Sequence, residues 1–260
     1  SDSGGGSGLQ ADLRTFAAQS VHGVCALTVV SSQNTNEFRS AWPVPASVVQ
    51  SQIEAILDDF DVKVVKTGLL YSRENIELIS EMADAGLLPS LIVDPVIVNR
   101  HGEPLYDGTT VDLIRRRLIP KALAITPNHL EAFRILGDEI NDDVEALSQA
   151  AQRLAAMGPS LVALTGGRRD TPSMVDVVAY EGEVNFLEVE RCLTSNVRGT
   201  GDTFSAAIAA GIAKGASPLD AVKKAQVFTS EAVRRAATWK LGSGEGPIDH
   251  LGQLNAAGLD

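Results

Sequence analysis

The stretch Gly199-Thr200-Gly201-Asp202-Thr203-Phe204 runs directly into a helix of small residues, Ser205-Ala206-Ala207-Ile208-Ala209-Ala210. Glycines let the backbone turn so that consecutive N–H groups converge, and the helix that follows adds the positive end of its dipole. Together they predict an anion-binding site suited to phosphate. Asp202 at its mouth would repel a static phosphate, but it fits a group that accepts the proton of an attacking hydroxyl. A turn in which Asp202 only caps the helix is the alternative.

Outward from this stretch, helical and strand patterns alternate along the chain. Apolar residues at helical spacing predict helices over residues 8–19, 47–60, 72–86, 111–118, 129–136, 144–157, 203–214 and 218–237. Short apolar runs predict strands over residues 24–30, 62–65, 91–93, 122–126 and 161–164, and the first of these is expected to be buried on both faces. Residues 175–180 and 184–189, around Glu181-Gly182, predict an antiparallel hairpin.

This alternation predicts an α/β fold, with a mostly parallel sheet, helices on both of its faces and an antiparallel edge made by the hairpin. Ser72 is expected to cap the third helix and Gly86 to end it. No long linker or low-complexity tract breaks the chain, so we expect one domain over residues 1–260. Because the chain opens on a glycine-rich loop, we expect a first strand upstream, in a longer chain.

The composition narrows the kind of partner that the protein can have. Hydrophobic residues make up 44% of the 260 residues, which is enough for a sizeable core and excludes a mainly disordered chain. The net charge of −11 argues against nucleic acid and anionic membranes, so an anionic ligand must be held by local groups such as backbone amides. Cys25 and Cys192 form no CxxC pair or zinc cluster. We expect a buried Cys25 and a cytoplasmic protein.

Polar residues and glycines recur where the predicted strands end. Gln33-Asn34, Gly68-Leu69, Asp94, Asn128 and Gly166-Gly167 each follow a different strand. Each is also an ordinary turn residue, but ligands of parallel sheets bind outside the carboxyl ends of the strands, so the recurrence predicts a binding site there. Two common phosphate-binding patterns, GxxxxGKS/T and GxGxxG, are absent from the sequence; Leu9 stands where the second pattern, begun at Gly4, requires glycine.

Six motifs, in order along the chain, carry a resemblance to a known family. They are Ser1-Asp2-Ser3-Gly4-Gly5-Gly6-Ser7-Gly8-Leu9-Gln10-Ala11-Asp12-Leu13, Gln33-Asn34-Thr35, Lys66-Thr67-Gly68-Leu69-Leu70, Val93-Asp94-Pro95-Val96, Thr126-Pro127-Asn128-His129-Leu130-Glu131-Ala132 and the stretch from Gly199 to Ile208. The sequence resembles the ribokinase-like kinases and, within them, the hydroxymethylpyrimidine/phosphomethylpyrimidine kinases of thiamine biosynthesis. The motif at Gly199 is shared by the superfamily, whereas the opening motif together with Gln33-Asn34-Thr35 is more specific to the pyrimidine kinases. The resemblance implies a three-layer α/β/α sandwich.

The resemblance also implies a reaction and a set of site residues. The reaction is the phosphorylation of 4-amino-5-hydroxymethyl-2-methylpyrimidine, and then of its monophosphate to the diphosphate, with ATP and Mg²⁺. The implied residues are Gly6, Asp12, Gln33, Leu69 and Val96 for the pyrimidine; Gly199, Thr200, Gly201 and Asp202 for phosphoryl transfer; Asn128, Thr165, Gly166, Gly167, Arg198 and Val227 for ATP; and Asp94 and Glu131 for Mg²⁺, through water. Their chemistry agrees, since a carboxylate accepts from an exocyclic amine, an amide serves a ring nitrogen, and hard carboxylates suit Mg²⁺.

Four positions depart from the residues that are usual in the family. The chain has Asp202 where many of these kinases have Cys, Thr165 where they often have Lys, Arg198 where they often have His, and Leu69 where Met is usual. The exchange at Leu69 keeps a similar volume and is expected to be mild. The missing Lys removes a positive charge from the phosphate region, and our hypothesis is that Arg198, Arg168 or Arg169 supplies it. Solvated loop arginines are the alternative.

Two rival functions are compatible with the sequence. A pyridoxal kinase is favoured by Asp202 and by similar chemistry on a hydroxymethyl ring, whereas Asp12, Gln33 and the opening motif argue against it. A non-catalytic pyrimidine-binding or regulatory domain is suggested by the missing Lys at Thr165, but a binding module would not need the whole set of acids and glycines. Superfamily analogy implies a homodimer that acts on small molecules, with neither nucleic acid nor membrane as a partner.

Overall fold

The computed structural model describes residues 1–99, 102–167 and 171–252 of the chain. These residues form two compact units, one built from residues 1–62 and from residue 192 onward, the other from residues 63–191. The chain therefore enters the second unit once and leaves it once. Because this division into compact units does not test the number of domains, our expectation of a single domain over residues 1–260 stays a prediction.

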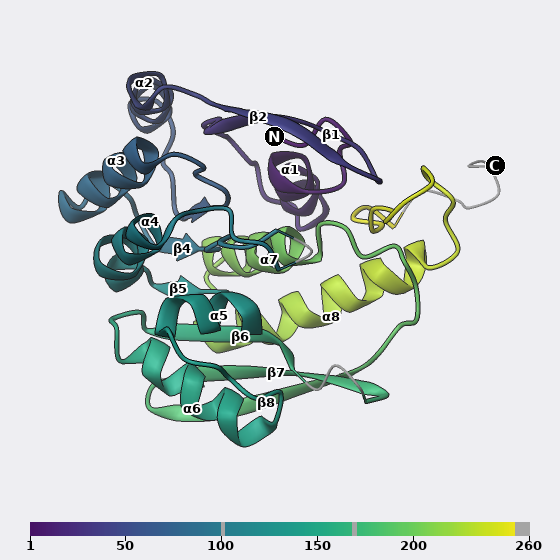
Figure 1. Ribbon diagram of the computed structural model, residues 1–260. Coiled ribbons are helices and arrows are strands. Elements are labelled where there is room, and N and C mark those ends of the chain that lie inside the picture. Colours follow the sequence, from purple (N-terminus) through teal and green to yellow (C-terminus); the bar gives the residue numbers. More distant parts are fainter. Residues whose placement is uncertain (100–101, 168–170, 253–260) are drawn as a thin grey trace. The chain divides into compact units, whose positions relative to one another are not determined.

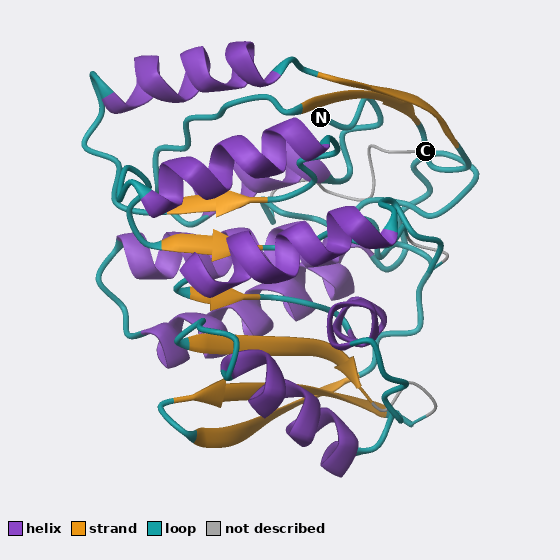
Figure 2. Ribbon diagram, turned by 60° about the vertical axis from the view of Figure 1, so that its left-hand side comes forward, coloured by secondary structure: helices purple, strands orange, loops and turns teal. Residues whose placement is uncertain are grey.

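The second unit is built on a six-stranded sheet whose strands lie in chain order (Figure 2). The strands are β3 (Val65–Thr67), β4 (Leu91–Val93), β5 (Ala124–Ile125), β6 (Leu161–Gly167), β7 (Ser173–Tyr180) and β8 (Glu183–Glu190). The first four run parallel, and β7 and β8 add an antiparallel hairpin at one edge. The predicted mostly parallel sheet with an antiparallel edge is therefore confirmed. Residues that follow the four parallel strands therefore lie at the same edge of this sheet, where the carboxyl ends of the strands are.

The helices of the second unit connect the parallel strands. They are α3 (Arg73–Asp84), α4 (Gly108–Leu113), which continues into a π turn over Ile114–Leu118 and a tight turn over Ile119–Lys121, α5 (His129–Leu136) and α6 (Val144–Ala155). Right-handed crossovers between neighbouring parallel strands put consecutive helices on the same face, and these four contact one another in chain order. Ser72 caps α3 by accepting a hydrogen bond from the N–H of Asn75 (3.2 Å), as predicted.

The first unit combines a group of helices with a small sheet. Its helices are α1 (Gly8–Ala18), α2 (Ala46–Leu57), α7 (Thr200–Ala213) and α8 (Pro218–Ala236), and its strands are β1 (Val29–Gln33) and β2 (Phe38–Pro43). Helix α7 packs against both α1 and α8 (Figure 1). The alanines from Ala206 to Ala210 are buried along α7, where small side chains allow neighbouring helices to approach closely. Among the described residues, no helix is long and apolar enough to cross a membrane.

The small sheet corrects two expectations. Residues 24–30 are predicted as a strand buried on both faces, but the strand begins only at Val29, and Val30 is 43% exposed. Strand β1 belongs to a two-stranded antiparallel sheet with β2, which leaves alternate side chains open to solvent. A continuous apolar run does not reveal such a partner, because it fits a buried and a half-exposed strand equally well. Cys25 lies in the irregular segment before the strand and is exposed, so the expectation of a buried Cys25 is wrong.

Candidate active site

The glycine loop at residues 4–8 is wound around the carboxylate of Asp2. This buried carboxylate accepts hydrogen bonds from the N–H groups of Gly4 (2.7 Å) and Gly6 (3.2 Å). The N–H and the hydroxyl of Ser7 also donate to it, at 3.0 and 2.7 Å. Asp2 thus fixes the shape of the loop that contains Gly6, a predicted substrate residue. The sequence signal for this role is an acid placed directly before a run of glycines, whose N–H groups need an acceptor.

The guanidinium of Arg198 joins this loop to β1. Its Nε donates to Oδ2 of Asp2 (3.1 Å) and its Nη2 to Oε1 of Gln33 (2.6 Å). Burial works against ionisation of Asp2, but the hydrogen bond from Ser7 and the charge of Arg198 outweigh it and keep the pKa of Asp2 below its usual value. The predicted role of Arg198 at the ATP phosphates stays a prediction, and both of these contacts are made with the predicted pyrimidine side of the site.

The predicted anion site lies at the start of α7 and touches the glycine loop. Gly199 is the N-cap residue of α7 and has a left-handed backbone, with φ of +85°. A Cβ at this position would lie well under 3.0 Å from the carbonyl oxygen of Gly6, so the two segments meet backbone to backbone. The N–H of Thr200 donates to the carbonyl oxygen of Val197 (3.3 Å), and glycine has no side chain that could cap the rest of the first turn. Asp202 is the third residue of α7 and not its N-cap, which argues against the alternative of a purely capping Asp202.

Asp12 and Asp202 both belong to the first unit. Asp12 is on α1 and Asp202 on α7, and these helices pack together. The amino group of Ser1 lies within electrostatic range of both carboxylates. Gln33 is tied to the start of α7 by Arg198, whose neighbour Gly199 is the N-cap of that helix. The first unit thus contains both predicted pyrimidine-binding side chains and the predicted proton acceptor, on elements that pack together or are joined by Arg198.

His250, which no sequence pattern singles out, lies in the same region. The residue is 3% exposed, and its Nε2 has no hydrogen-bond partner among the described residues. Burial and the positive charge of Arg14 lower the pKa of His250 to about 4, although the charges of Asp202 and Asp249 oppose this change. The ring is therefore neutral near pH 7. A single histidine beyond the last helix offers no periodicity or spacing from which this position could be predicted.

We expect the protein to lose stability as the pH falls from about 6.5 to about 4, because of His250. The unfolded chain binds a proton on this residue near pH 6.5, whereas the folded chain resists protonation until about pH 4. Protonation therefore favours unfolding throughout this window, by up to about 3 kcal/mol at its acidic end. Urea unfolding of the wild type and of His250→Gln across the window measures this. The variant lacks the titrating ring and should show the flatter curve; parallel curves would contradict the assignment.

In the second unit, a buried pair of carboxylates lies at the carboxyl edge of the sheet. Asp94 directly follows β4, and Glu131 is on α5; both are buried. Burial raises the pKa of Glu131, and the charge of Asp94 raises it further. Lys66 on β3 brings its Nζ to 3.9 Å from Oδ2 of Asp94, and its side chain is only 2% exposed. The pattern of charges does not single out this buried cation, because Lys63 lies three residues earlier in the same segment and the predicted strand 62–65 stops before Lys66.

Glu131 also fixes the chain on either side of the site. Its Oε1 accepts the N–H of Ile97 and its Oε2 that of Asn128, both at 3.0 Å, and Asn128 in turn caps α5. Val96, next to Ile97, has a left-handed backbone with φ of +43°, which is strained for a β-branched residue. The bond from Ile97 to Glu131 holds this turn, and with it Val96, in that conformation. Val96 is a predicted substrate residue, and such strain is most often found at functional sites.

The predicted nucleotide residues of the second unit lie at the same edge of the sheet. Asn128 and Thr165 form a parallel bridge after β5 and within β6. Gly167 has a packing role, because a Cβ there would lie 2.5 Å from Cδ1 of Leu147. Gly166 has a left-handed backbone and open space where a Cβ would stand, and its N–H donates to Oδ1 of Asp176 (3.3 Å).

Three further predictions concern residues away from these clusters. Leu69 follows β3 and is half-buried, whereas Val227, on α8 of the first unit, is 56% exposed. Their predicted roles at the pyrimidine and at ATP stay predictions. Arg168 and Arg169, which are candidates to replace the missing Lys, lie outside the described residues.

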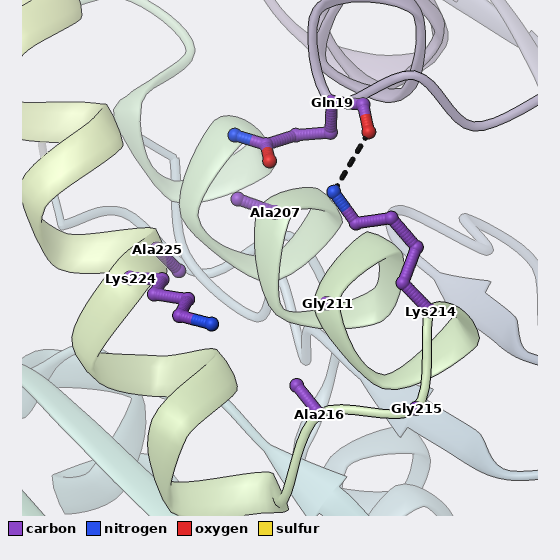
Figure 3. A pocket seen from close by; sticks show the side chains of 8 residues that line it. All are labelled: Gln19, Ala207, Gly211, Lys214, Gly215, Ala216, Lys224 and Ala225. Carbon is purple, nitrogen blue, oxygen red and sulfur yellow. Dashed lines mark hydrogen bonds between the residues drawn. The ribbon is translucent and has the colours of Figure 1, made fainter.

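A hollow of about 270 Å³ lies at the opposite end of α7 from Asp202 (Figure 3). It is lined by the last turn of α7, by Lys224 on α8 and by Gln19 after α1. Lys214 donates a hydrogen bond across its rim to the carbonyl oxygen of Gln19 (2.9 Å). None of the predicted site residues lines this hollow, so it is separate from the candidate active site.

A helix start that can bind an anion, with a carboxylate beside it, suits phosphoryl transfer. Comparison with solved structures places the chain among the ribokinase-like small-molecule kinases. The pyridoxal kinase of Bacillus subtilis, solved as an ADP complex, matches with a TM-score of 0.90 and 34% sequence identity. The match covers 98% of this chain and 96% of the pyridoxal kinase. A phosphomethylpyrimidine kinase of Clostridium difficile 630 has a TM-score of 0.78 at 31% identity, over 90% of this chain and 96% of that one. The predicted ribokinase-like fold class is confirmed.

Sequence comparison narrows this class to one family. The sequence model of the family described as Phosphomethylpyrimidine kinase matches residues 2–249. The hydroxymethylpyrimidine/phosphomethylpyrimidine kinase of Streptomyces coelicolor is 38% identical over 250 residues, which are 96% of this chain and 91% of that protein. The chain belongs to the phosphomethylpyrimidine kinase family, and the resemblance seen in its motifs is confirmed.

Proposed function

We propose that this protein transfers the γ-phosphoryl group of ATP to the hydroxymethyl group of 4-amino-5-hydroxymethyl-2-methylpyrimidine, and then phosphorylates the monophosphate. The observation that carries the proposal is the backbone contact between Gly199 and Gly6, since it joins the start of α7 to the loop around Asp2. A phosphate at the helix start would then stand beside a substrate held by Asp12 and Gln33. Membership of the family supports the same class of substrate.

In this reaction Asp202 orients the substrate hydroxyl and accepts its proton late in the transfer. A carboxylate is too weak a base to deprotonate an alcohol outright, but a loose transition state needs little early activation of the nucleophile. The amides at the start of α7 would stabilise the transferring phosphoryl group, because the positive end of the helix dipole points at it. The roles of Val96 and Leu69 at the pyrimidine ring stay predictions.

Asp94 and Glu131 fit Mg²⁺ through water better than directly. Both oxygens of Glu131 already accept a backbone N–H, and no group of three or more acidic, histidine or cysteine side chains in the described residues could hold a metal ion. Mg²⁺ usually keeps several waters and is bound jointly by one or two carboxylates and by phosphates. When bound, it would neutralise charge on the ATP phosphates.

A pyridoxal kinase is the second candidate, and the similarity to the Bacillus subtilis enzyme favours it. A coupled assay of ADP release, run with the hydroxymethylpyrimidine, its monophosphate and pyridoxal, decides between the two. We expect kcat/KM to be highest for the pyrimidine, with turnover of the monophosphate as well. Preference for pyridoxal would replace our proposal by the second candidate. Binding of the pyrimidine without any ADP release would mean a non-catalytic binding domain.

We also propose that the protein is a homodimer, by analogy within the superfamily. The small sheet supports this, because its cross-strand neighbours Val30 and Trp42 are 43% and 57% exposed, and exposed apolar groups of this kind favour interfaces. Sedimentation equilibrium should give twice the mass of the chain, and Trp42→Lys should shift the equilibrium toward monomer. A monomeric wild type at micromolar concentration would refute the proposal.

A further inference from the structure

The guanidinium of Arg198 bridges two groups with different tasks, the carboxylate of Asp2 that shapes the glycine loop and the side-chain amide of Gln33. We propose that Arg198 is a positioning residue: it fixes which atoms of Gln33 face the substrate and so makes the site specific for a ring nitrogen with a free lone pair. The inference rests on the proposed function, because it requires that Gln33 contacts the substrate ring. It gives Arg198 a role in substrate recognition in place of phosphate binding.

The contact with Arg198 fixes the orientation of the Gln33 amide. An arginine side chain has five donors and no acceptor, so the atom 2.6 Å from Nη2 must be the amide oxygen. The amide nitrogen of Gln33 is then turned away from Arg198, and it can only donate. Without such a partner, an amide can turn over and present either its oxygen or its nitrogen in nearly the same place.

Both ends of the bridge are anchored. The hydroxyl of Ser3 donates to the carbonyl oxygen of Gln33 (2.7 Å) and accepts from its N–H (2.8 Å), which fixes the backbone at this position. On the other side, Asp2 is held by the amides of the glycine loop. The stem of Arg198 runs across Gly6, where a Cβ would lie 3.0 Å from Cδ of Arg198. The guanidinium therefore has little freedom to leave Gln33.

The charge of Arg198 is matched where it stands. Its Nε lies 3.1 Å from Oδ2 of Asp2, and the two side chains are 11% and 0% exposed. A cation paired with a buried carboxylate has little net charge left for a phosphate elsewhere, and breaking the pair would leave the carboxylate buried and uncompensated. This argues against Arg198 as the substitute for the missing Lys of the phosphate region.

An amide that can only donate discriminates by what it rejects. A ring nitrogen with a lone pair completes the hydrogen bond from Gln33. A C–H at the same ring position leaves the amide N–H without a partner once the substrate has displaced water, and such losses are costly. A site whose amide is free to turn over would discriminate less, because it could present its oxygen to the C–H instead.

The test is a double-mutant cycle on Arg198 and Gln33, with kcat and KM measured for the pyrimidine and KM measured for ATP. Arg198→Met keeps the length of the stem and removes the bridge, and Gln33→Leu removes the amide. We expect each single change to raise the KM of the pyrimidine about 10- to 100-fold, with kcat nearly unchanged and the KM of ATP unchanged. The combined variant should be no worse than Gln33→Leu alone, because Arg198 acts through Gln33.

Two further measurements separate positioning from folding. Arg198→Lys keeps a charge beside Asp2 but lacks the fork that reaches both partners, so it should recover thermal stability lost in Arg198→Met while the KM of the pyrimidine stays high. The second measurement uses a pyridine analogue in which C–H replaces the ring nitrogen. Arg198→Met should prefer the pyrimidine over this analogue about 10-fold less than the wild type does.

Three results would overturn the role of Arg198. The first is that the effects of Arg198→Met and Gln33→Leu on the KM of the pyrimidine multiply in the combined variant. The second is that Arg198→Met raises the KM of ATP and leaves the KM of the pyrimidine unchanged. The third is that Arg198→Lys fully recovers the KM of the pyrimidine. A wild type that turns over no pyrimidine would instead refute the proposed function. In that case, the side-chain amide signals of Gln33 in ¹⁵N NMR spectra still test whether Arg198 fixes the amide. The signals should change in Arg198→Met, and unchanged signals would show that the arginine does not fix the amide.

Discussion

Asp202→Asn is expected to lower kcat by about 10²- to 10⁴-fold while the pyrimidine and ATP still bind. Asparagine has nearly the same size as aspartate, but it cannot take up the proton that the substrate hydroxyl loses during transfer. The amides at the start of α7 stay in place, since Asp202 is the third residue of the helix and not its cap. Both KM values should therefore change by less than about 5-fold, corresponding to less than about 1 kcal/mol. Steady-state kinetics of ADP release, with a separate binding titration, measures the two effects.

The matched control for this change is Asp220→Asn. Asp220 is likewise the third residue of its helix, α8, where it accepts a hydrogen bond from the hydroxyl of Ser217 (2.8 Å). Each change removes a negative charge from the first turn of a helix, so each costs a similar interaction with the helix dipole. Asp220→Asn should leave kcat as it is in the wild type. A nearly normal kcat in Asp202→Asn would refute the assignment of Asp202 as the proton acceptor.

Much of the second unit could be predicted from sequence because its segments carry local signals. Strand β4 and helix α5 have the predicted bounds, 91–93 and 129–136. The strand is a short apolar run, and the helix is capped by Asn128, whose side chain accepts the N–H of Glu131 (3.0 Å). Such signals lie within a few residues of the element that they define, so no knowledge of the fold is needed to find them.

The small sheet of the first unit was not predictable in the same way. Its strands pair residues 29–33 with 38–43, and neither segment shows a clean alternation of apolar and polar residues. The turn depends on the side-chain oxygen of Asn34, which accepts the N–H groups of Asn36 and Glu37. Asn34 therefore acts as an ordinary turn residue, which was the alternative to a binding role for the polar residues at strand ends.

The candidate site shows the same limit. Residues at the ends of strands, such as Asp94, could be predicted because topology brings strand ends together. The signal at Asp2 points to the glycine loop but not to its distant partner Arg198, and the roles of Lys66 and His250 could not be predicted, because they come from burial and from partners far away in the chain. Asp2 and Arg198, for example, are 196 residues apart. Sequence patterns show which side chains can do chemistry, whereas such a pairing appears only in the folded chain.

Gly199→Ala is expected to destabilise the protein by about 3 kcal/mol or more and to lower kcat/KM at least about 100-fold. The φ of +85° alone costs an alanine about 1 kcal/mol. The new Cβ would also collide with the carbonyl oxygen of Gly6. Neither side can yield easily, because the N–H of Gly6 is bonded to Asp2 and Gly199 is the N-cap of α7. The collision therefore forces the start of α7 away from the glycine loop, and phosphate and pyrimidine lose their alignment.

Two control glycines separate the causes of this loss. Gly215, after the other end of α7, has the same φ of +85°, but a Cβ there would meet nothing within 4 Å, so Gly215→Ala should cost only about 1 kcal/mol and keep activity. Gly201 lies inside the helix, again with nothing within 4 Å, and alanine there should stabilise by up to about 1 kcal/mol. Urea unfolding should thus rank Gly201→Ala as the most stable variant and Gly199→Ala as the least. Equal losses at Gly199 and Gly215 would mean that the protein does not need the contact with Gly6, and the link between phosphate and pyrimidine sites would lose its structural basis.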